Sequence, residues 1–139
     1  MPETIRRNVG DLPYSLHDRR VCALEISGDS LTLRFSDGIV RIGDPCELVD
    51  GHITIDGLDW DFCWAYIMDI ADDGKIRSGK RMSLKDFIVR YTDLNFEIVD
   101  ETYGYNRSVF NGYLSIGHTL PECRIEVYHF GPMRYITEI

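Results

Sequence analysis

Residues 21–42 form three short runs in which every second residue is apolar, and two-residue turn signals separate the runs. The first signal is Gly28-Asp29 and the second is Asp37-Gly38. A period of two is typical of a strand with one buried face, and dipeptides of this kind favour tight hairpins. We therefore predict a three-stranded antiparallel meander, the feature that most constrains how this chain can fold.

The turn positions also fix a register for the meander. One face then carries only apolar pairs, which are Cys22–Phe35, Leu24–Leu33, Ile26–Leu31, Phe35–Val40 and Leu33–Ile42. A shift by one residue would expose all of them, so the register is strongly specified. We expect Arg34 on the opposite, solvated face, and we expect the rest of the chain to cover the apolar one.

Further strands are predicted at 52–56, 58–70, 96–105, 109–116, 124–130 and 133–137. Asn111-Gly112 could instead be a hairpin turn, and the sequence leaves that alternative open. One helix begins after Ser83 as its N-cap and ends near 93–95, and its apolar stripe includes Phe87. The predicted fold is mostly β (α+β): an antiparallel curved sheet or open barrel-like sandwich of about eight to nine strands with one covering helix.

The chain has 139 residues, of which 44% are hydrophobic, and a net charge of -8. This size and composition predict a single domain over 1–139, with an N-terminal arm at 1–19. The negative charge argues against a nucleic-acid partner. No run of about 18 apolar residues is present, so we expect no membrane span. The N-terminal residues carry no apolar signal core, so we expect a cytoplasmic protein. The four cysteines lack any regular spacing, and free thiols are then expected.

In residues 58–70 every second residue is apolar, an alternation that is unusually long for one strand. One face carries aromatic side chains, and the other carries acids at both of its ends. We expect a bend or bulge in so long a strand. The stripe that includes Trp60 and Trp64 is interpreted as core, and the acids as facing water. A ligand platform built from these aromatics is the alternative.

Motifs for catalysis or cofactors are weak. Gly74 to Lys80 matches G-x-x-x-x-G-K, but Arg81 stands where a P-loop needs Ser or Thr. The spacing of the histidines, cysteines and acids does not match that of a metal site. The neighbours His17 and Asp18 fit a turn better than an acid–base pair, and Cys123 near His118 lacks any nucleophile signature. We predict no catalytic residue, no metal and no cofactor.

Acidic residues and tyrosines are the better candidates for function. If the later strand at 96–105 neighbours the long one, they form one acidic face edged by tyrosines. Tyrosine is enriched at interfaces, and charge speeds encounter with an oppositely charged partner. The predicted binding residues are Asp59, Asp61, Asp69, Glu97, Asp100, Glu101, Tyr103 and Tyr105. A basic protein is the expected partner, and self-association stays open.

The N-terminal third carries Leu16-His17-Asp18 before the first strand, and then Leu-Thr-Leu-x-Phe-x-Asp-Gly at 31–38. Over about the first 40 residues it resembles several small uncharacterised bacterial β-rich families. Some of these resemble immunity proteins of polymorphic toxin systems, which are commonly small, acidic and cytosolic. The resemblance implies an immunity-like role and assigns no catalytic residue.

We therefore predict a non-enzymatic, immunity-like binding protein that acts through an acidic and aromatic surface. The alternative is a small enzyme or small-molecule binder with a pocket near Trp60, Trp64 and the helix.

Overall fold

The computed structural model describes residues 2–5, 12–70 and 73–137. Within that part of the chain, 10 strands form one antiparallel sheet in the order β1-β13-β7-β4-β3-β10-β11-β12-β8-β9. In chain order they are β1 (Glu3–Ile5), β3 (Arg20–Ser27), β4 (Ser30–Phe35), β7 (Gly51–Ile55), β8 (Trp64–Ile70), β9 (Ile76–Ser83), β10 (Phe96–Gly104), β11 (Arg107–Leu114), β12 (Glu122–Tyr128) and β13 (Met133–Thr137). A 3-stranded sheet holds β2 (Tyr14–Ser15), β5 (Ile39–Arg41) and β6 (Glu47–Val49). The mostly-β antiparallel class is confirmed, with more strands than expected.

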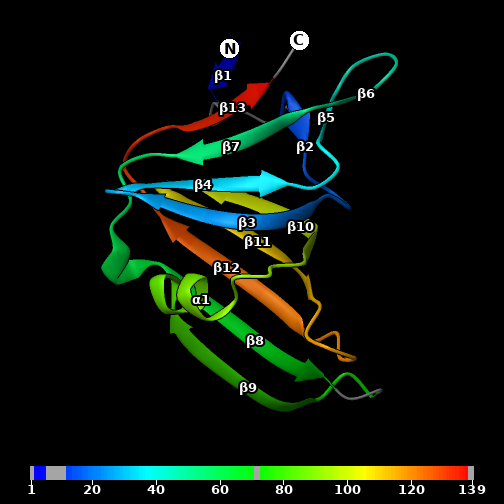
Figure 1. Cartoon of the computed structure of the whole chain (residues 1–139), viewed down its shortest axis with the longest axis vertical. Coiled ribbons are helices and arrows are strands. Elements are labelled where there is room, and N and C mark those ends of the chain that lie inside the picture. The colour runs from blue at the N-terminus through cyan, green and yellow to red at the C-terminus, as the bar shows by residue number, and fades with distance from the viewer. Residues whose placement is uncertain (1, 6–11, 71–72, 138–139) are drawn as a thin grey trace.

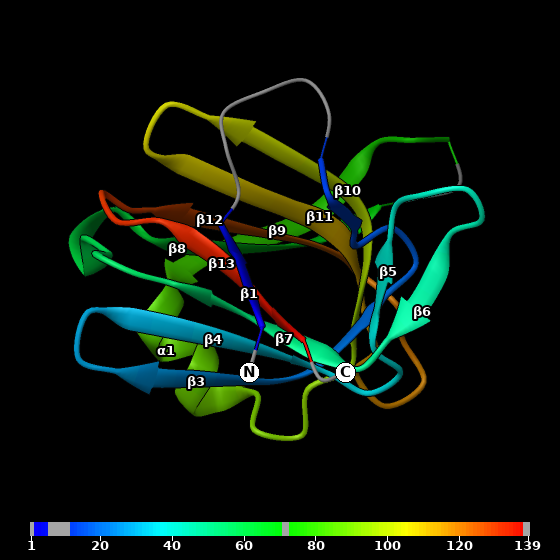
Figure 2. The ribbon, with the colours of Figure 1, turned by 90° about the horizontal axis from the view of Figure 1, so that it is seen from above.

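The large sheet curls so that its two halves face each other across the core (Figures 1 and 2). The helix α1 (Leu84–Arg90) lies across the open side, and its Leu84 and Phe87 are fully buried. Ser83 is the N-cap, because the backbone N–H of Asp86 donates to Ser83 Oγ at 3.1 Å. The predicted covering helix is therefore confirmed, although it ends at Arg90, earlier than expected.

The first hairpin of the predicted meander is confirmed. Ile26 pairs with Leu31 and Leu24 with Leu33, as the turn at Gly28-Asp29 requires. Leu33 is buried and Arg34 is exposed. A bulge between Val21 and Ala23 then shifts the register. Phe35 consequently pairs with Val21, and Cys22 is exposed where we predicted it buried.

The prediction that residues 39–42 form the third strand of the meander is wrong. The chain leaves β4 at Gly38, which has φ +78° and lies against the backbone of Val49 in β6. β5 therefore joins the small sheet, between β2 and β6. The second neighbour of β4 is β7, with Leu33 opposite Ile53, so the predicted pairings of Phe35 with Val40 and of Leu33 with Ile42 do not form.

The predicted strand at 58–70 is broken by a 3-10 turn, η1 (Trp60–Phe62), and β8 begins only at Trp64. The expected bend is thus present, but the buried face is the opposite of the one predicted. Cys63, Ala65 and Ile67 face the core, because the turn breaks the alternation and places these smaller side chains inward. Trp64 lies on the outer face, where the guanidinium of Arg81 is 4.1 Å from its ring centroid.

A second irregularity reverses the faces of β10. The register shifts between Ile98 and Asp100, so Val99 is an extra residue. Phe96 and Ile98 point into the core before the bulge, and Glu101, paired with the buried Phe110, lies on the inner side after it. Asn111-Gly112 lies inside β11 opposite this bulge, which settles the open alternative in favour of a strand.

Candidate functional site

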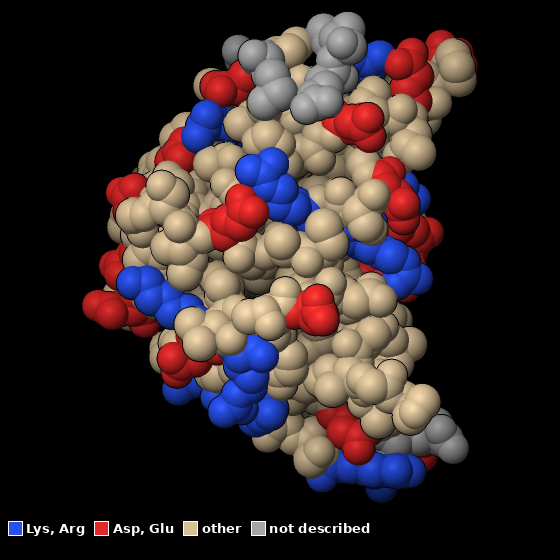
Figure 3. All heavy atoms as spheres, viewed as in Figure 1, with Lys and Arg blue, Asp and Glu red and all other residues tan. Residues whose placement is uncertain are grey.

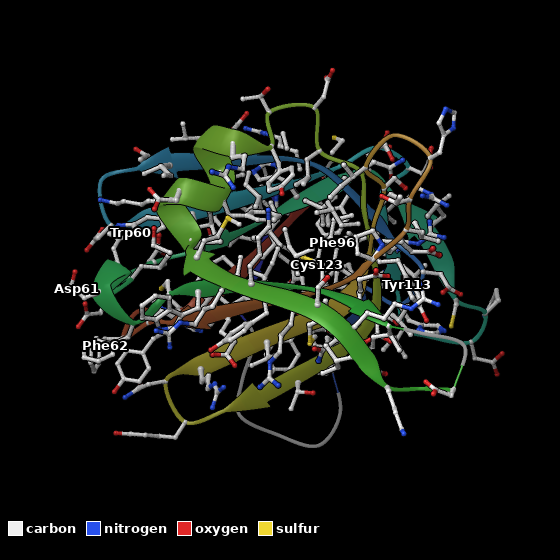
Figure 4. The ribbon with its side chains drawn as sticks, turned by 90° about the horizontal axis from the view of Figure 1, so that it is seen from below. Trp60, Asp61, Phe62, Phe96, Tyr113 and Cys123 are labelled. Carbon is white, nitrogen blue, oxygen red and sulfur yellow. The ribbon has the colours of Figure 1, made fainter. Side chains whose placement is uncertain are left out.

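Four connections of the large sheet meet at one end of the molecule, on the left in Figure 2. They are the β3–β4 turn, the β7–β8 connection with η1, the β10–β11 turn and the β12–β13 connection. We call the acidic and aromatic side chains that reach the surface there the loop-end surface. Asp59 and Trp60 are half-buried in it, and the exposed members are Asp29, Asp61, Phe62, Tyr105 and Phe130. Figure 4 shows Trp60, Asp61 and Phe62 together at this end, apart from Phe96 and Cys123.

A charge pair holds the loop end in place. Arg134 Nε donates to Asp56 Oδ2 at 2.8 Å and Arg134 Nη2 to Oδ1 at 3.1 Å, and Ser30 Oγ donates to Oδ1 at 2.7 Å. Burial favours the neutral carboxyl, but the hydrogen bonds from Arg134 and Ser30 outweigh it and lower the pKa of Asp56 from its ordinary 3.8. Three strands, β4, β7 and β13, are thereby tied at the entry to the η1 segment.

We expect Asp56→Asn to lower the free energy of unfolding by about 1.5 to 3 kcal/mol, because it removes a charge-assisted bidentate pair. A lowered carboxyl pKa stabilises the fold above the ordinary value and loses that contribution as the pH falls through the folded-state pKa. The difference in free energy of unfolding between wild type and Asp56→Asn should therefore be largest near pH 7 and should shrink below about pH 4. Urea unfolding across that pH range measures this difference. A difference that does not change with pH would contradict this role of Asp56.

The η1 segment is also fixed by its contact with the β12–β13 connection. Gly57 has φ +66°, and a Cβ there would lie 2.6 Å from the backbone nitrogen of Gly131. The backbone N–H of Phe130 donates to the Gly57 carbonyl at 2.8 Å. Because the two backbones touch directly, Trp60 and Phe130 are carried on segments whose relative position is fixed.

Between these segments lies an open hollow of about 580 Å³. Its lining residues are Asp29, Gly57, Leu58, Asp59, Trp60, Asp61 and Phe130. The indole N–H of Trp60 donates to the Gly28 carbonyl at 3.1 Å, and Lys85 Nζ lies 5.1 Å from the ring centroid. The ring is thus held in place as one wall of the hollow.

Large aromatic side chains are exposed at this end of the molecule, in the hollow and beyond it. Phe62 is 59% exposed, Phe130 65% and Tyr105 87%. The Tyr128 ring packs between the first two, with centroids 5.8 Å from Phe62 and 5.2 Å from Phe130. Clustered exposed aromatics are unusual on an isolated soluble protein and mark interaction sites.

The acids of the loop end carry unneutralised charge. Within the described residues, no salt bridge joins Asp29, Asp59 or Asp61 to a cation. Asp59 Oδ1 accepts from the backbone N–H of Asp61, at 3.2 Å, as the N-cap of η1. Figure 3 shows acidic atoms along its left edge, where Figure 1 places the β3–β4 turn and η1. The loop-end surface therefore combines aromatic area with negative potential.

The single acidic face predicted from the sequence does not form. β11 and β12 separate β8 from β10, so the acids of the two strands are not neighbours. Asp59, Asp61 and Tyr105 lie at the loop end, whereas the exposed Asp69 lies in the last part of β8. Glu97 pairs with Arg20 at 3.9 Å, and Asp100 is exposed beside the β10 bulge.

Glu101 and Tyr103 serve the fold on the inner side of the sheet. Glu101 Oε2 accepts from the backbone N–H of Leu16 at 2.7 Å, and Tyr103 Oη donates to Oε1 at 2.6 Å. Burial raises the pKa of Tyr103 well above its ordinary value, so the phenol stays protonated and donates. The bulge in β10, invisible in the sequence, explains why these two residues point inward. Glu101 thereby anchors the segment that precedes β3.

The sequence did not reveal a buried serine–histidine pair. Ser108 Oγ lies 2.8 Å from His129 Nε2, and His129 Nδ1 lies 2.8 Å from the Gly131 carbonyl. Since Nδ1 must donate to that carbonyl, Nε2 accepts from the serine in the neutral ring. This is the hydrogen-bond order of a nucleophile and its base, but Ser108 exposes no surface to a substrate. The pair braces the β12–β13 connection that carries Phe130.

The other candidate pairs do not form catalytic sites. Cys123 is buried, burial raises its pKa to about 12, and His118 lies in an exposed loop. His17 Nδ1 lies 2.5 Å from the Val99 carbonyl, and its Nε2 lies 3.4 Å from Asp18 Oδ2. The Val99 contact, helped by Asp18, raises the pKa of His17. The pair belongs to an exposed turn that docks on the β10 bulge.

The alternative pocket near Trp60, Trp64 and the helix is also divided. Trp60 lines the hollow, whereas Trp64 packs under Arg81 on the outer face of β8. No group of three or more potential metal ligands occurs among the described residues. In the same residues, no helix is long and apolar enough to cross a membrane. The four cysteines are unpaired, with Cys22 and Cys46 exposed.

Comparison of the chain with protein-family models, with curated proteins and with solved structures finds no match.

Proposed function

We propose that this chain is a non-enzymatic binding protein that holds a basic protein partner on its loop-end surface. The observation that carries the proposal is the exposure of Phe62 and Phe130 close to carboxylates that form no salt bridge within the described residues. Aromatic side chains supply the buried area at the centre of an interface, and the surrounding charge steers the partner. Asp59, Asp61 and Tyr105, predicted as binding residues from the sequence, remain in the proposed site.

The rigidity of the surface supports the same proposal. The Asp56–Arg134 pair, the Gly57–Gly131 contact and the Ser108–His129 pair all hold the segments that carry its aromatic residues. A surface that is ordered before binding loses less conformational entropy when the partner docks.

The resemblance of the first 40 or so residues to immunity-like families makes a protein toxin the partner that we favour. Four unpaired thiols, two of them exposed, suit a reducing compartment, so we place the complex in the cytoplasm. An immunity protein acts by occupying its toxin, which requires a surface and no catalytic group.

Charge reversal tests the proposal. A basic protein retained from cells that contain this chain would be purified, and its association rate with wild type would be compared with that of Asp59→Lys and Asp61→Lys. We expect each reversal to slow association about 10-fold at low salt, because steering acts mainly on the on-rate. Salt should reduce the difference.

Asp69→Lys is the matched control, because it makes the same charge change on an exposed residue of β8 outside the loop-end surface. It should change the association rate by less than about 2-fold. Equal slowing by all three variants would show that only net charge matters, and no slowing by any would contradict the proposal.

A small-molecule binder is the second candidate, favoured by the volume of the hollow alone, which is within the usual range for ligand sites. The aromatic residues extend beyond the hollow to Phe62 and Tyr105, and that spread favours a macromolecule.

A further inference from the structure

We infer that the hollow between Trp60 and Phe130 receives the guanidinium of one arginine side chain of the partner. This inference rests on the proposed function and adds the chemical group that the site recognises. The hollow has two aromatic walls, from Trp60 in η1 and Phe130 in the β12–β13 connection, and carboxylates from two separate segments. An aromatic wall attracts a cation through its ring face, and a carboxylate attracts it through charge.

The carboxylates are placed to receive donors from more than one side. Asp29 comes from the β3–β4 turn, whereas Asp59 and Asp61 come from the η1 segment. Asp59 uses Oδ1 for the backbone N–H of Asp61, and no hydrogen bond among the described residues uses its Oδ2. The sites left for a ligand are therefore acceptors that a cationic donor can fill.

The Trp60 ring already has a cation close to it. Lys85 Nζ lies 5.1 Å from the ring centroid, and Lys85 is not among the residues that line the hollow. The indole N–H is used by the Gly28 carbonyl, so Trp60 has no spare donor that would attract an anion into the hollow. A neighbouring positive charge is thus tolerated at this ring, whereas an anion would meet three carboxylates.

Arginine fits this arrangement better than lysine. A guanidinium is flat, so its face can stack on an aromatic ring while its five N–H groups point sideways to carboxylates. An ammonium directs its three donors within one cone and is more strongly hydrated, so stacking and pairing compete. Carboxylates on separate segments around aromatic walls match the first geometry.

The test uses the intact chain with Trp64→Phe, which leaves Trp60 as the sole tryptophan, so that its fluorescence reports on the hollow. The probe is the peptide acetyl-Gly-Arg-Gly-amide. The matched peptides carry citrulline, which has the same shape without the charge, or lysine in place of arginine. We expect saturable change with the arginine peptide and at least about 5-fold weaker binding of the other two.

Phe130→Ala and Asp61→Asn should each weaken binding of the arginine peptide about 10-fold, a loss typical of one cation–π or charged contact. Asp69→Asn, which lies outside the hollow, should leave it unchanged. Circular dichroism and unfolding curves confirm that each variant is folded, and Asp61, exposed in η1, is the variant least able to disturb the fold. Equal binding of citrulline or lysine, or indifference to both loop-end variants, would overturn the inference.

The failures of the two proposals are distinguishable. If a basic partner depends on Asp59 and Asp61 but the arginine peptide does not bind, the hollow does not read arginine while the proposed function stands. If the peptide binds and no basic protein does, the inference about the hollow stands and the proposed function falls.

Discussion

Replacing Gly112 by alanine should lower the free energy of unfolding by at least about 3 kcal/mol, and it should leave little folded protein if the total stability is modest. Gly112 lies in β11 opposite the β10 bulge, and a Cβ built on it would be 1.7 Å from the carbonyl oxygen of Glu97. That atom belongs to the backbone of a central strand, so no side-chain rotation can relieve the overlap. Either β10 moves away or the bulge is lost.

The matched control is Gly104→Ala. Gly104 ends the same β10, is exposed, and a Cβ there would have no atom within 4 Å. Its stability should change by less than about 0.5 kcal/mol, as at most open surface positions. Urea unfolding measures both variants, and equal effects would show that the close approach at Gly112 does not exist.

Phe87→Ala should cost about 3 to 5 kcal/mol, the usual range for a fully buried phenylalanine. Phe87 is on the inner face of α1 in the main core, and its ring packs on Tyr91 with centroids 4.9 Å apart. The cavity would open where the helix covers the open side of the curled sheet. We expect the loss in thermal and urea unfolding alike.

Val89→Ala is the matched control on the same helix, because Val89 is 77% exposed. It should change stability by less than about 0.5 kcal/mol. Small and equal effects of both substitutions would mean that α1 is not docked on the core.

Some of this fold could be predicted because strong local signals carry it. The β3–β4 hairpin follows from alternation and a two-residue turn, and α1 follows from the Ser83 cap and its apolar spacing. These signals lie within a few residues of each other, so no tertiary information is needed.

The errors in which face of a strand is buried share one physical origin. A single extra residue at Val99 and the turn at Trp60–Phe62 each change the alternation of a strand. Such a change has almost no sequence signature, but it exchanges the inner and outer faces of everything that follows. For this reason Glu101 is predicted on the surface and Trp64 in the core, whereas the structure places Glu101 on the inner side and Trp64 on the outer face.

The residues of the candidate site were also predictable only in part. Asp59 and Asp61 could be selected as acids at one end of the predicted strand at 58–70, and Tyr105 as a tyrosine close to acidic residues in the later strand. Phe130 was missed, because an aromatic residue at the end of a strand looks like core until the neighbouring strands are placed. The only signal for it was the Gly131-Pro132 turn that follows directly and places Phe130 at a connection.

Amide hydrogen exchange of the chain with and without its purified basic partner tests the proposed interface most directly. We predict added protection centred on residues 56–62 and 128–132, which carry the loop-end surface, and little change along the exposed edge strand β9. Protection confined to β9 or to the outer face around Trp64, with the loop end unchanged, would contradict the central claim.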